Sequence, residues 1–157
     1  MKKRPANALG PQFLSCLETT VKLDPSAFVA DPTLIQALEE RSSSITCRSD
    51  QVLFQQGEVP AGLYILDKGA ATLTMNSNEG KPVVSVQTAP GSLLGLPGLV
   101  GNEPYTLTAV ARTGAELSFV TRDNFTALMQ SDPMLALKVL QVLAAEVRSA
   151  RNAILQR

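Results

Sequence analysis

The segments VLFQQGE at residues 52–58 and LYILDKG at residues 63–69 decide how this sequence folds. Each begins with a run of branched or aromatic apolar residues, which is typical of a β-strand. A glycine closes each run, Gly57 in the first segment and Gly69 in the second. Glycine accepts the positive φ of a tight corner at little cost, so both segments are predicted to be strands that end at sharp turns.

Short β-rich runs separated by turn residues occur throughout residues 44–121. Residues 76–80, with the sequence NSNEG, are typical of a hairpin turn. Short β-rich runs occur at residues 45–47, 52–54, 62–66, 70–75, 82–86, 106–111 and 117–120. Many short strands at this spacing predict a mainly β fold with flanking helices, in which residues 44–121 form a jelly-roll β-barrel.

Helices are predicted on both sides of the barrel. Asp24, Asp31 and Asp132 each precede a proline; such an aspartate accepts amide hydrogen bonds at a helix start, and proline fits the first helical turn. We expect a flexible arm at residues 1–12, N-terminal helices at residues 13–43 and C-terminal helices at residues 122–157, all in one domain. The first helix is expected to carry five apolar residues: Phe13, Leu14, Leu17, Val21 and Leu23.

The long helix predicted after Asp132 has two apolar strips. One is a seam with alternating steps of four and three residues: Ala136, Leu140, Leu143, Val147, Ala150 and Ile154. The other strip contains Leu135, Val139 and Val142. One helix cannot bury such a seam alone, so we expect the second strip to face the barrel and the seam, from Leu140 onward, to form a homodimer. The alternative is a helix that packs wholly on its own domain.

Composition excludes most enzyme classes. The 157 residues contain no histidine and only two cysteines, Cys16 and Cys47, which are far apart in the sequence. The usual zinc sites, histidine-ligated haem and histidine-containing catalytic triads are therefore excluded, and a typical iron–sulfur cluster needs more cysteines. We expect no metal, no cofactor and no catalytic residue.

Charge and hydropathy limit the partners. The formal net charge is zero, so no basic surplus is available to neutralise the phosphates of a nucleic acid. No apolar run approaches the roughly 20 residues of a membrane span. The basic start of the chain, residues 1–4, is not followed by the apolar core of a signal peptide. We expect a cytoplasmic protein that by itself binds neither nucleic acid nor membrane.

Five sequence features together resemble the cyclic-nucleotide-binding domain family, the sensor module of bacterial regulators akin to the catabolite activator protein. They are the segments at residues 52–58 and 63–69, the Pro90-Gly91 pair, Phe125 and Pro133. The resemblance covers about residues 32–155 and implies a helix, a jelly-roll barrel, a short helix and a long helix in that order.

The resemblance places a phosphate-binding cassette at residues 90–109. The family pattern is F-G-E followed by P-R-(S/T/A)-A-T, in which the glutamate accepts a ribose hydroxyl and the arginine neutralises the cyclic phosphate. Here Leu96 stands at the glutamate position and Tyr105 at the arginine position. The candidate ligand-binding residues of this degenerate cassette are Gly91, Leu94, Gly95, Leu96, Pro97, Tyr105, Thr106 and Thr108.

Both replacements weaken any grip on a cyclic nucleotide. Losing two hydrogen bonds to charged groups costs roughly 3–6 kcal/mol, or about 10²–10⁴ in affinity. Arg112, Arg148 and Arg151 are the cations that could substitute, although surface positions are expected for them. Three outcomes stay open: a pocket filled by its own leucines, a small apolar or aromatic effector, or residual cyclic-nucleotide binding.

These features predict a non-catalytic regulatory or sensor domain that does not bind cyclic AMP or GMP in the usual way. The alternative is the sensor half of a ligand-responsive transcription regulator, because regulators of this family place a helix-turn-helix domain where this chain stops, at Arg157. A jelly-roll enzyme is a further alternative, which the lack of histidine disfavours because such enzymes typically use histidine-rich metal sites.

Overall fold

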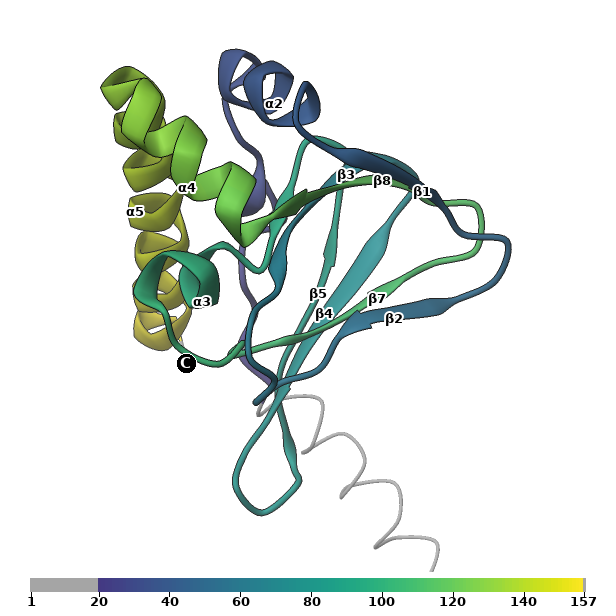
Figure 1. Ribbon diagram of the computed structural model, residues 1–157. Helices are drawn as coiled ribbons and strands as arrows, with labels where there is room; N and C mark the ends of the chain where they lie inside the picture. Colours follow the sequence, from purple (N-terminus) through teal and green to yellow (C-terminus); the bar gives the residue numbers. More distant parts are fainter. Residues whose placement is uncertain (1–19, 157) are drawn as a thin grey trace, which may run out of the picture.

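A computed structural model describes residues 20–156 and shows a β-barrel with helices gathered on one side of it (Figure 1). Two antiparallel four-stranded sheets form the barrel, in the strand orders β1-β8-β3-β6 and β2-β7-β4-β5. The strands are β1 (Ser43–Thr46), β2 (Gln51–Phe54), β3 (Gly62–Lys68), β4 (Ala71–Asn76), β5 (Pro82–Thr88), β6 (Leu93–Leu94), β7 (Thr108–Ala111) and β8 (Glu116–Thr121). The predicted jelly-roll class is confirmed.

Helices flank the barrel in sequence and cover it in space. They are the 3-10 helix η1 (Pro25–Phe28), α2 (Pro32–Glu39), α3 (Leu96–Gly101), α4 (Arg122–Ser131) and α5 (Pro133–Leu155). In Figure 1, α2, α3 and α4 lie on the same side of the barrel as the long helix α5. Among residues 20–156, no helix is long and apolar enough to cross a bilayer.

All three Asp-Pro pairs start helices, as predicted. The carboxylate of Asp24 accepts a hydrogen bond from the Ser26 amide at 3.0 Å, and that of Asp31 accepts one from Thr33 at 2.8 Å. Asp132 does the same for the Met134 amide at 3.1 Å, at the start of α5. Each cap satisfies an amide that has no partner within its own helix, which stabilises a helix by about 1 kcal/mol.

The helix predicted to run through Val21 and Leu23 is wrong where the structure describes it. Residues 13–19 lie outside the described part, but Val21 is extended, forms a parallel bridge with Val84, and donates its amide hydrogen to the Val83 carbonyl at 2.6 Å. The edge strand β5 leaves backbone groups unpaired, and a β-branched residue pairs with them more readily than it nucleates a short isolated helix. The arm predicted at residues 1–12 and Cys16 also lie outside the described residues.

The strand predicted at residues 106–111 is shorter than expected. Thr106 and Leu107 lie in a bend, and β7 begins only at Thr108. The backbone carbonyl of Tyr105 accepts a hydrogen bond from the Gly57 amide at 2.8 Å, and the amide of Tyr105 donates one to the Glu58 carbonyl at 2.9 Å. This local pairing satisfies the backbone of Tyr105 outside the β2–β7 ladder, so the ladder starts later.

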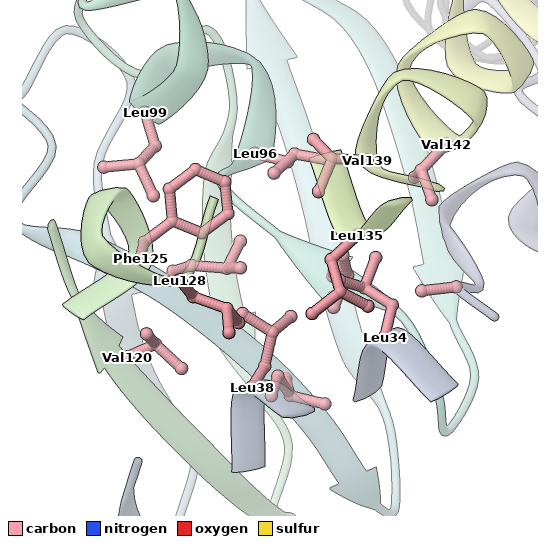
Figure 2. Close-up of a cluster of buried hydrophobic side chains, with 14 residues drawn as sticks. Leu34, Leu38, Leu96, Leu99, Val120, Phe125, Leu128, Leu135, Val139 and Val142 are labelled. Carbon is pink, nitrogen blue, oxygen red and sulfur yellow. The ribbon is translucent and has the colours of Figure 1, made fainter. Parts of the chain in front are cut away.

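The buried side chains form two clusters, and the cassette contributes to both. One cluster fills the space between the helices and the β3–β8 face, and Figure 2 shows its members, among them Leu34, Leu96, Phe125 and Val139. The other fills the barrel, and it includes Phe54, Leu94 and Tyr105. Residues 94–105 therefore connect the helical layer with the barrel interior.

Candidate functional site

The candidate site is the segment between β6 and β7, where the family resemblance places its ligand. Gly95 joins β6 to α3 with a φ of 93°. A side chain at this position would be strained by the positive φ, and its Cβ would lie 2.8 Å from the Cε1 atom of Tyr105. Gly95 therefore allows Tyr105 to pack directly against the backbone at the start of α3.

Leu96 is a core residue. Its exposed fraction is 0%, and it belongs to the helical cluster, in which Figure 2 shows its side chain pointing toward Val139 of α5. Burying a leucine side chain of this kind contributes about 1.5–3 kcal/mol relative to leaving it exposed. Leu96 therefore ties α3 to α5 rather than offering a group to a ligand.

Tyr105 is also buried, with 5% of its surface exposed. Its ring stacks on Phe54 with 3.9 Å between the ring centroids, and its hydroxyl donates to the Gly62 carbonyl at 2.8 Å. Burial raises the pKa of Tyr105 above its ordinary value, so the ring carries a neutral hydroxyl at physiological pH. At the position where the resemblance expects a cation, the structure has a neutral side chain with its hydrogen bond already made.

The space left beneath the cassette is small. A cavity of about 20 Å³ lies among Gly95, Pro97, Gly98, Tyr105 and Thr106, with further walls from the barrel and α5. This volume holds about one water molecule, whereas pockets for drug-sized ligands measure roughly 300–1,000 Å³. A cyclic nucleotide does not fit here unless the cassette moves.

One ionisable residue that the sequence analysis did not single out reaches this cavity. Glu146 of α5 lines it, and the Oε2 atom of its carboxyl group is buried without a hydrogen-bond partner in the described part of the chain. Desolvation raises the pKa of Glu146 from its ordinary 4.5 to about 8. The sequence did contain a signal, because Glu146 lies four residues after Val142, on the strip predicted to face the barrel.

The cations considered as substitutes do not reach the cassette. Arg112 pairs with Asp50 at 3.3 Å, Arg148 lines a separate polar pocket beside Lys22, and Arg151 is exposed. Among the described residues that line the cassette cavity, none is a lysine or an arginine. The only ionisable carboxyl group in that lining is Glu146, which would repel a phosphate when charged.

The predicted site residues separate into two groups. Five lie together around the cavity or in the cluster beneath it: Leu94, Gly95, Pro97, Tyr105 and Thr106. The other three do not line this cavity: Gly91, Leu96 and Thr108. The amide of Gly91 donates to the Leu66 carbonyl at 2.8 Å, and the hydroxyl of Thr108 accepts from the Gln56 amide at 2.9 Å, so both serve the barrel.

The two strips of α5 face different surroundings. Leu135, Val139 and Val142 are buried in the helical cluster, as predicted. Of the seam residues, Leu140, Val147 and Ile154 are 56%, 48% and 64% exposed. Leu143 packs partly on the helical cluster, and Ala150 lines a groove beside the barrel, so the seam is shared between its own domain and the surface.

A metal centre finds no support in the described residues. Within residues 20–156, no group of three or more Cys, Asp or Glu side chains is placed to hold a metal ion. Cys47 is a buried free thiol, and burial raises its pKa. A raised pKa reduces the fraction of reactive thiolate, so Cys47 has the properties of a packing residue.

Comparisons with known proteins agree with this architecture. The catabolite activator protein of Thermus thermophilus superposes with a TM-score of 0.69 at 22% identity, over 83% of this chain and 62% of that chain. The sensor domain of the transcriptional regulator DNR from Pseudomonas aeruginosa superposes with a TM-score of 0.58 at 23% identity, over 73% of this chain and 77% of that one.

A curated relative is much longer than this chain. A lysophospholipase of Neurospora crassa is 26% identical over 125 residues, which is 75% of this chain but 8% of that protein. Residues 44–132 match the family described as the cyclic nucleotide-binding domain. The match spans nearly the whole barrel, the cassette and α4, and the chain therefore belongs to the cyclic nucleotide-binding domain family.

Proposed function

We propose that this protein is a non-catalytic regulatory domain whose cassette does not bind cyclic AMP or cyclic GMP in the usual way. The observation that carries the proposal is the position of Tyr105, which is buried, stacked on Phe54 and hydrogen-bonded to Gly62 where the family resemblance expects a phosphate-binding arginine. The similar regulator sensor domains support the regulatory role. A cytoplasmic location goes with this proposal.

Three physical features support the loss of cyclic-nucleotide binding. The cavity of about 20 Å³ is too small for a nucleotide, and its described lining lacks a cation. Leu96 is buried in the helical cluster, and its apolar side chain offers no carboxylate to a ribose hydroxyl. A charged Glu146 would repel a phosphate across a poorly hydrated space, where like charges interact strongly.

Titration calorimetry with cyclic AMP and with cyclic GMP tests this proposal. We expect no binding of either nucleotide at micromolar concentrations, because roughly 3–6 kcal/mol of charge-assisted contacts are missing. Dissociation constants below one micromolar for either nucleotide would refute the proposal.

We further propose that the barrel and its helices act as one domain that dimerises through α5. Support comes from the three exposed apolar side chains Leu140, Val147 and Ile154, which are spaced by seven residues along one face of the helix. A repeat of seven residues is typical of helices that pair along their length. Sedimentation equilibrium tests the proposal, and a mass of one chain at high concentration would refute it.

A second candidate function is the sensor half of a transcription regulator. The N-terminal domain of a transcriptional regulator from Streptomyces coelicolor A3(2) favours it, since it superposes with a TM-score of 0.59 over 83% of this chain and 90% of that one. The coding sequence downstream of Arg157 tests this candidate. A helix-turn-helix segment encoded there would support it, and a stop codon would refute it.

A further inference from the structure

A groove beside the cassette is lined almost entirely by apolar side chains. It measures about 400 Å³ and lies between the first described residues, the β4–β5 hairpin, the end of the cassette and α5. Its walls include Val21, Leu23, Phe28, Met75, Leu107 and Ile154. The volume falls in the range of small-molecule pockets, about 300–1,000 Å³.

Glu146 is the one carboxyl group among the described residues that line this groove. It also lines the small cavity under Tyr105, so its side chain stands where the cavity and the groove meet. Its Oε2 atom has no hydrogen-bond partner within the described residues, although buried carboxyl groups ordinarily have one. The nearby hydroxyl of Ser149 accepts from the Asp24 amide at 2.7 Å, and no hydrogen bond joins it to the Oε2 atom of Glu146.

We propose that the groove binds a small molecule with an apolar body and a single amine group, and that the carboxyl group of Glu146 is the counter-ion of that amine. The inference rests on the proposed function in one respect, since it names the chemistry of the effector that a regulatory domain without a cyclic-nucleotide site would sense. The apolar walls would hold the body of the ligand, and the carboxyl group would fix its orientation.

Charge complementarity favours an amine over other polar groups. A carboxylate or a phosphate would be repelled by Glu146 or would force it to stay protonated. A neutral alcohol can make one ordinary hydrogen bond, whereas an ammonium group makes a charge-assisted bond that is roughly twice as strong. The advantage is largest in a site from which water is excluded, which the buried position of the Oε2 atom provides.

The protonation state of Glu146 supplies a second signature. Because its pKa lies at about 8 in the empty groove, the carboxyl group is mostly neutral at pH 7. An ammonium group stabilises the carboxylate, so binding of the cation releases close to one proton. Tyr105 is the other titratable group in the described linings, and its hydroxyl already donates to Gly62.

The other charged residues near this region are not among those that line the groove. Lys22 and Asp24, from the segment before η1, and Arg148 of α5 line a neighbouring polar pocket that shares Leu23 and Ser149 with the groove. Lys81, in the β4–β5 hairpin, and Arg151 of α5 are exposed. The proton released on binding is therefore assigned to Glu146.

Titration calorimetry with three probes of equal chain length tests the proposal. Octylamine, octanol and octanoate are titrated into the full chain at pH 7, in two buffers with different ionisation enthalpies. We expect octylamine to bind at least about tenfold more tightly than octanol, which corresponds to about 1.4 kcal/mol, and octanoate to bind most weakly. We expect proton release with octylamine only.

Two variants test whether Glu146 causes the preference for octylamine and the release of a proton. Glu146→Gln should bind octylamine no better than octanol and should release no proton. Glu79→Gln is the matched control, because it makes the same substitution in an exposed turn, and it should behave like the wild type. The comparison of the probes in the wild-type protein does not depend on the folding of either variant.

Several results would overturn the inference. Equal affinities for octylamine and octanol, an amine preference that survives Glu146→Gln, or no binding of any probe would each do so. The last result would mean that another occupant fills the groove, such as residues 1–19 or a second copy of the chain. Cyclic AMP titrated into the same samples tests the proposed function separately, because sub-micromolar binding would refute that function whatever the amines do.

Discussion

The ring of Tyr105 stacks on the ring of Phe54, with 3.9 Å between centroids and 19° between the planes. Phe54 ends the first strand segment that identified the fold, and Tyr105 stands at the cation position of the cassette. The contact makes Tyr105, which stands where the family resemblance expects a phosphate-binding arginine, part of the barrel core.

The hydroxyl of Tyr105 is expected to stabilise the fold. Tyr105→Phe keeps the stacked ring and removes the 2.8 Å hydrogen bond to Gly62, so we expect a loss of about 1 kcal/mol in the free energy of unfolding, measured with urea. Tyr64→Phe is the control, since its hydroxyl makes a longer bond of 3.3 Å to the Leu53 carbonyl and should cost less. An unchanged stability of Tyr105→Phe would contradict this role.

Restoring the family's glutamate at Leu96 is expected to fail. Leu96→Glu places a carboxyl group in the helical cluster without a partner, which should cost about 3–5 kcal/mol and bring no affinity for cyclic AMP. Leu96→Met conserves volume and polarity and should cost less than about 1.5 kcal/mol. Urea unfolding and calorimetry measure the two effects, and a well-folded Leu96→Glu that binds cyclic AMP would show that the cassette can still open.

Gly95 is expected to tolerate substitution less well than another glycine with a positive φ. Gly95→Ala brings its Cβ to 2.8 Å from the ring of Tyr105, while Gly80→Ala has a similar φ of 82° and no atom within 4 Å of the new Cβ. The backbone strain of about 1–2 kcal/mol is common to both variants. A greater loss of melting temperature for Gly95→Ala therefore reports the contact with Tyr105, and equal losses would show that the ring simply moves aside.

Glu146 is expected to make the stability depend on pH. Its pKa of about 8 in the folded protein lies above the ordinary 4.5, so between these values the unfolded chain releases a proton that the folded protein keeps. The contribution of Glu146 is therefore complete below pH 4.5 and is lost as pH rises toward 8, by up to about 1.4 kcal/mol per pH unit.

Glu146→Gln removes this titration. We expect the variant to gain stability over the wild type progressively across that window, measured by urea unfolding at a series of pH values. Glu79→Gln should follow the wild type throughout, because its side chain is exposed. Parallel profiles for the wild type and Glu146→Gln would place the Glu146 carboxyl group in water instead.

Charges in the exposed seam are expected to separate the proposed dimer. Leu140→Glu and Ile154→Glu each place a charge in the proposed interface, where it would face the same charge or an apolar surface of the partner helix. We therefore expect sedimentation equilibrium to report monomers for both variants. Val59→Glu is the control, because Val59 is 80% exposed and lies outside α5. If both variants remained dimeric, the interface would lie elsewhere on the protein.

Local features of the sequence predicted the fold well. The glycines at residues 57 and 69 adopt the positive φ values expected of them, and each Asp-Pro pair caps a helix. These signals depend only on neighbouring backbone groups, so they can be interpreted without knowledge of the tertiary structure. The helix predicted through Val21 and Leu23 is wrong where the structure describes it, because Val21 pairs with the edge strand β5, which is distant in the sequence.

The sequence by itself determined the barrel, the order of the helices and the absence of the usual charged residues at Leu96 and Tyr105. Only the tertiary structure decided the surroundings of these positions: Leu96 packs in the helical cluster, Tyr105 packs in the barrel core, and Glu146 of α5 lines the cavity beside Tyr105. Glu146 lies 41 positions after Tyr105 in the sequence. Strand and helix signals act over a few residues, whereas the fate of a buried carboxyl group depends on which distant side chains exclude water from it.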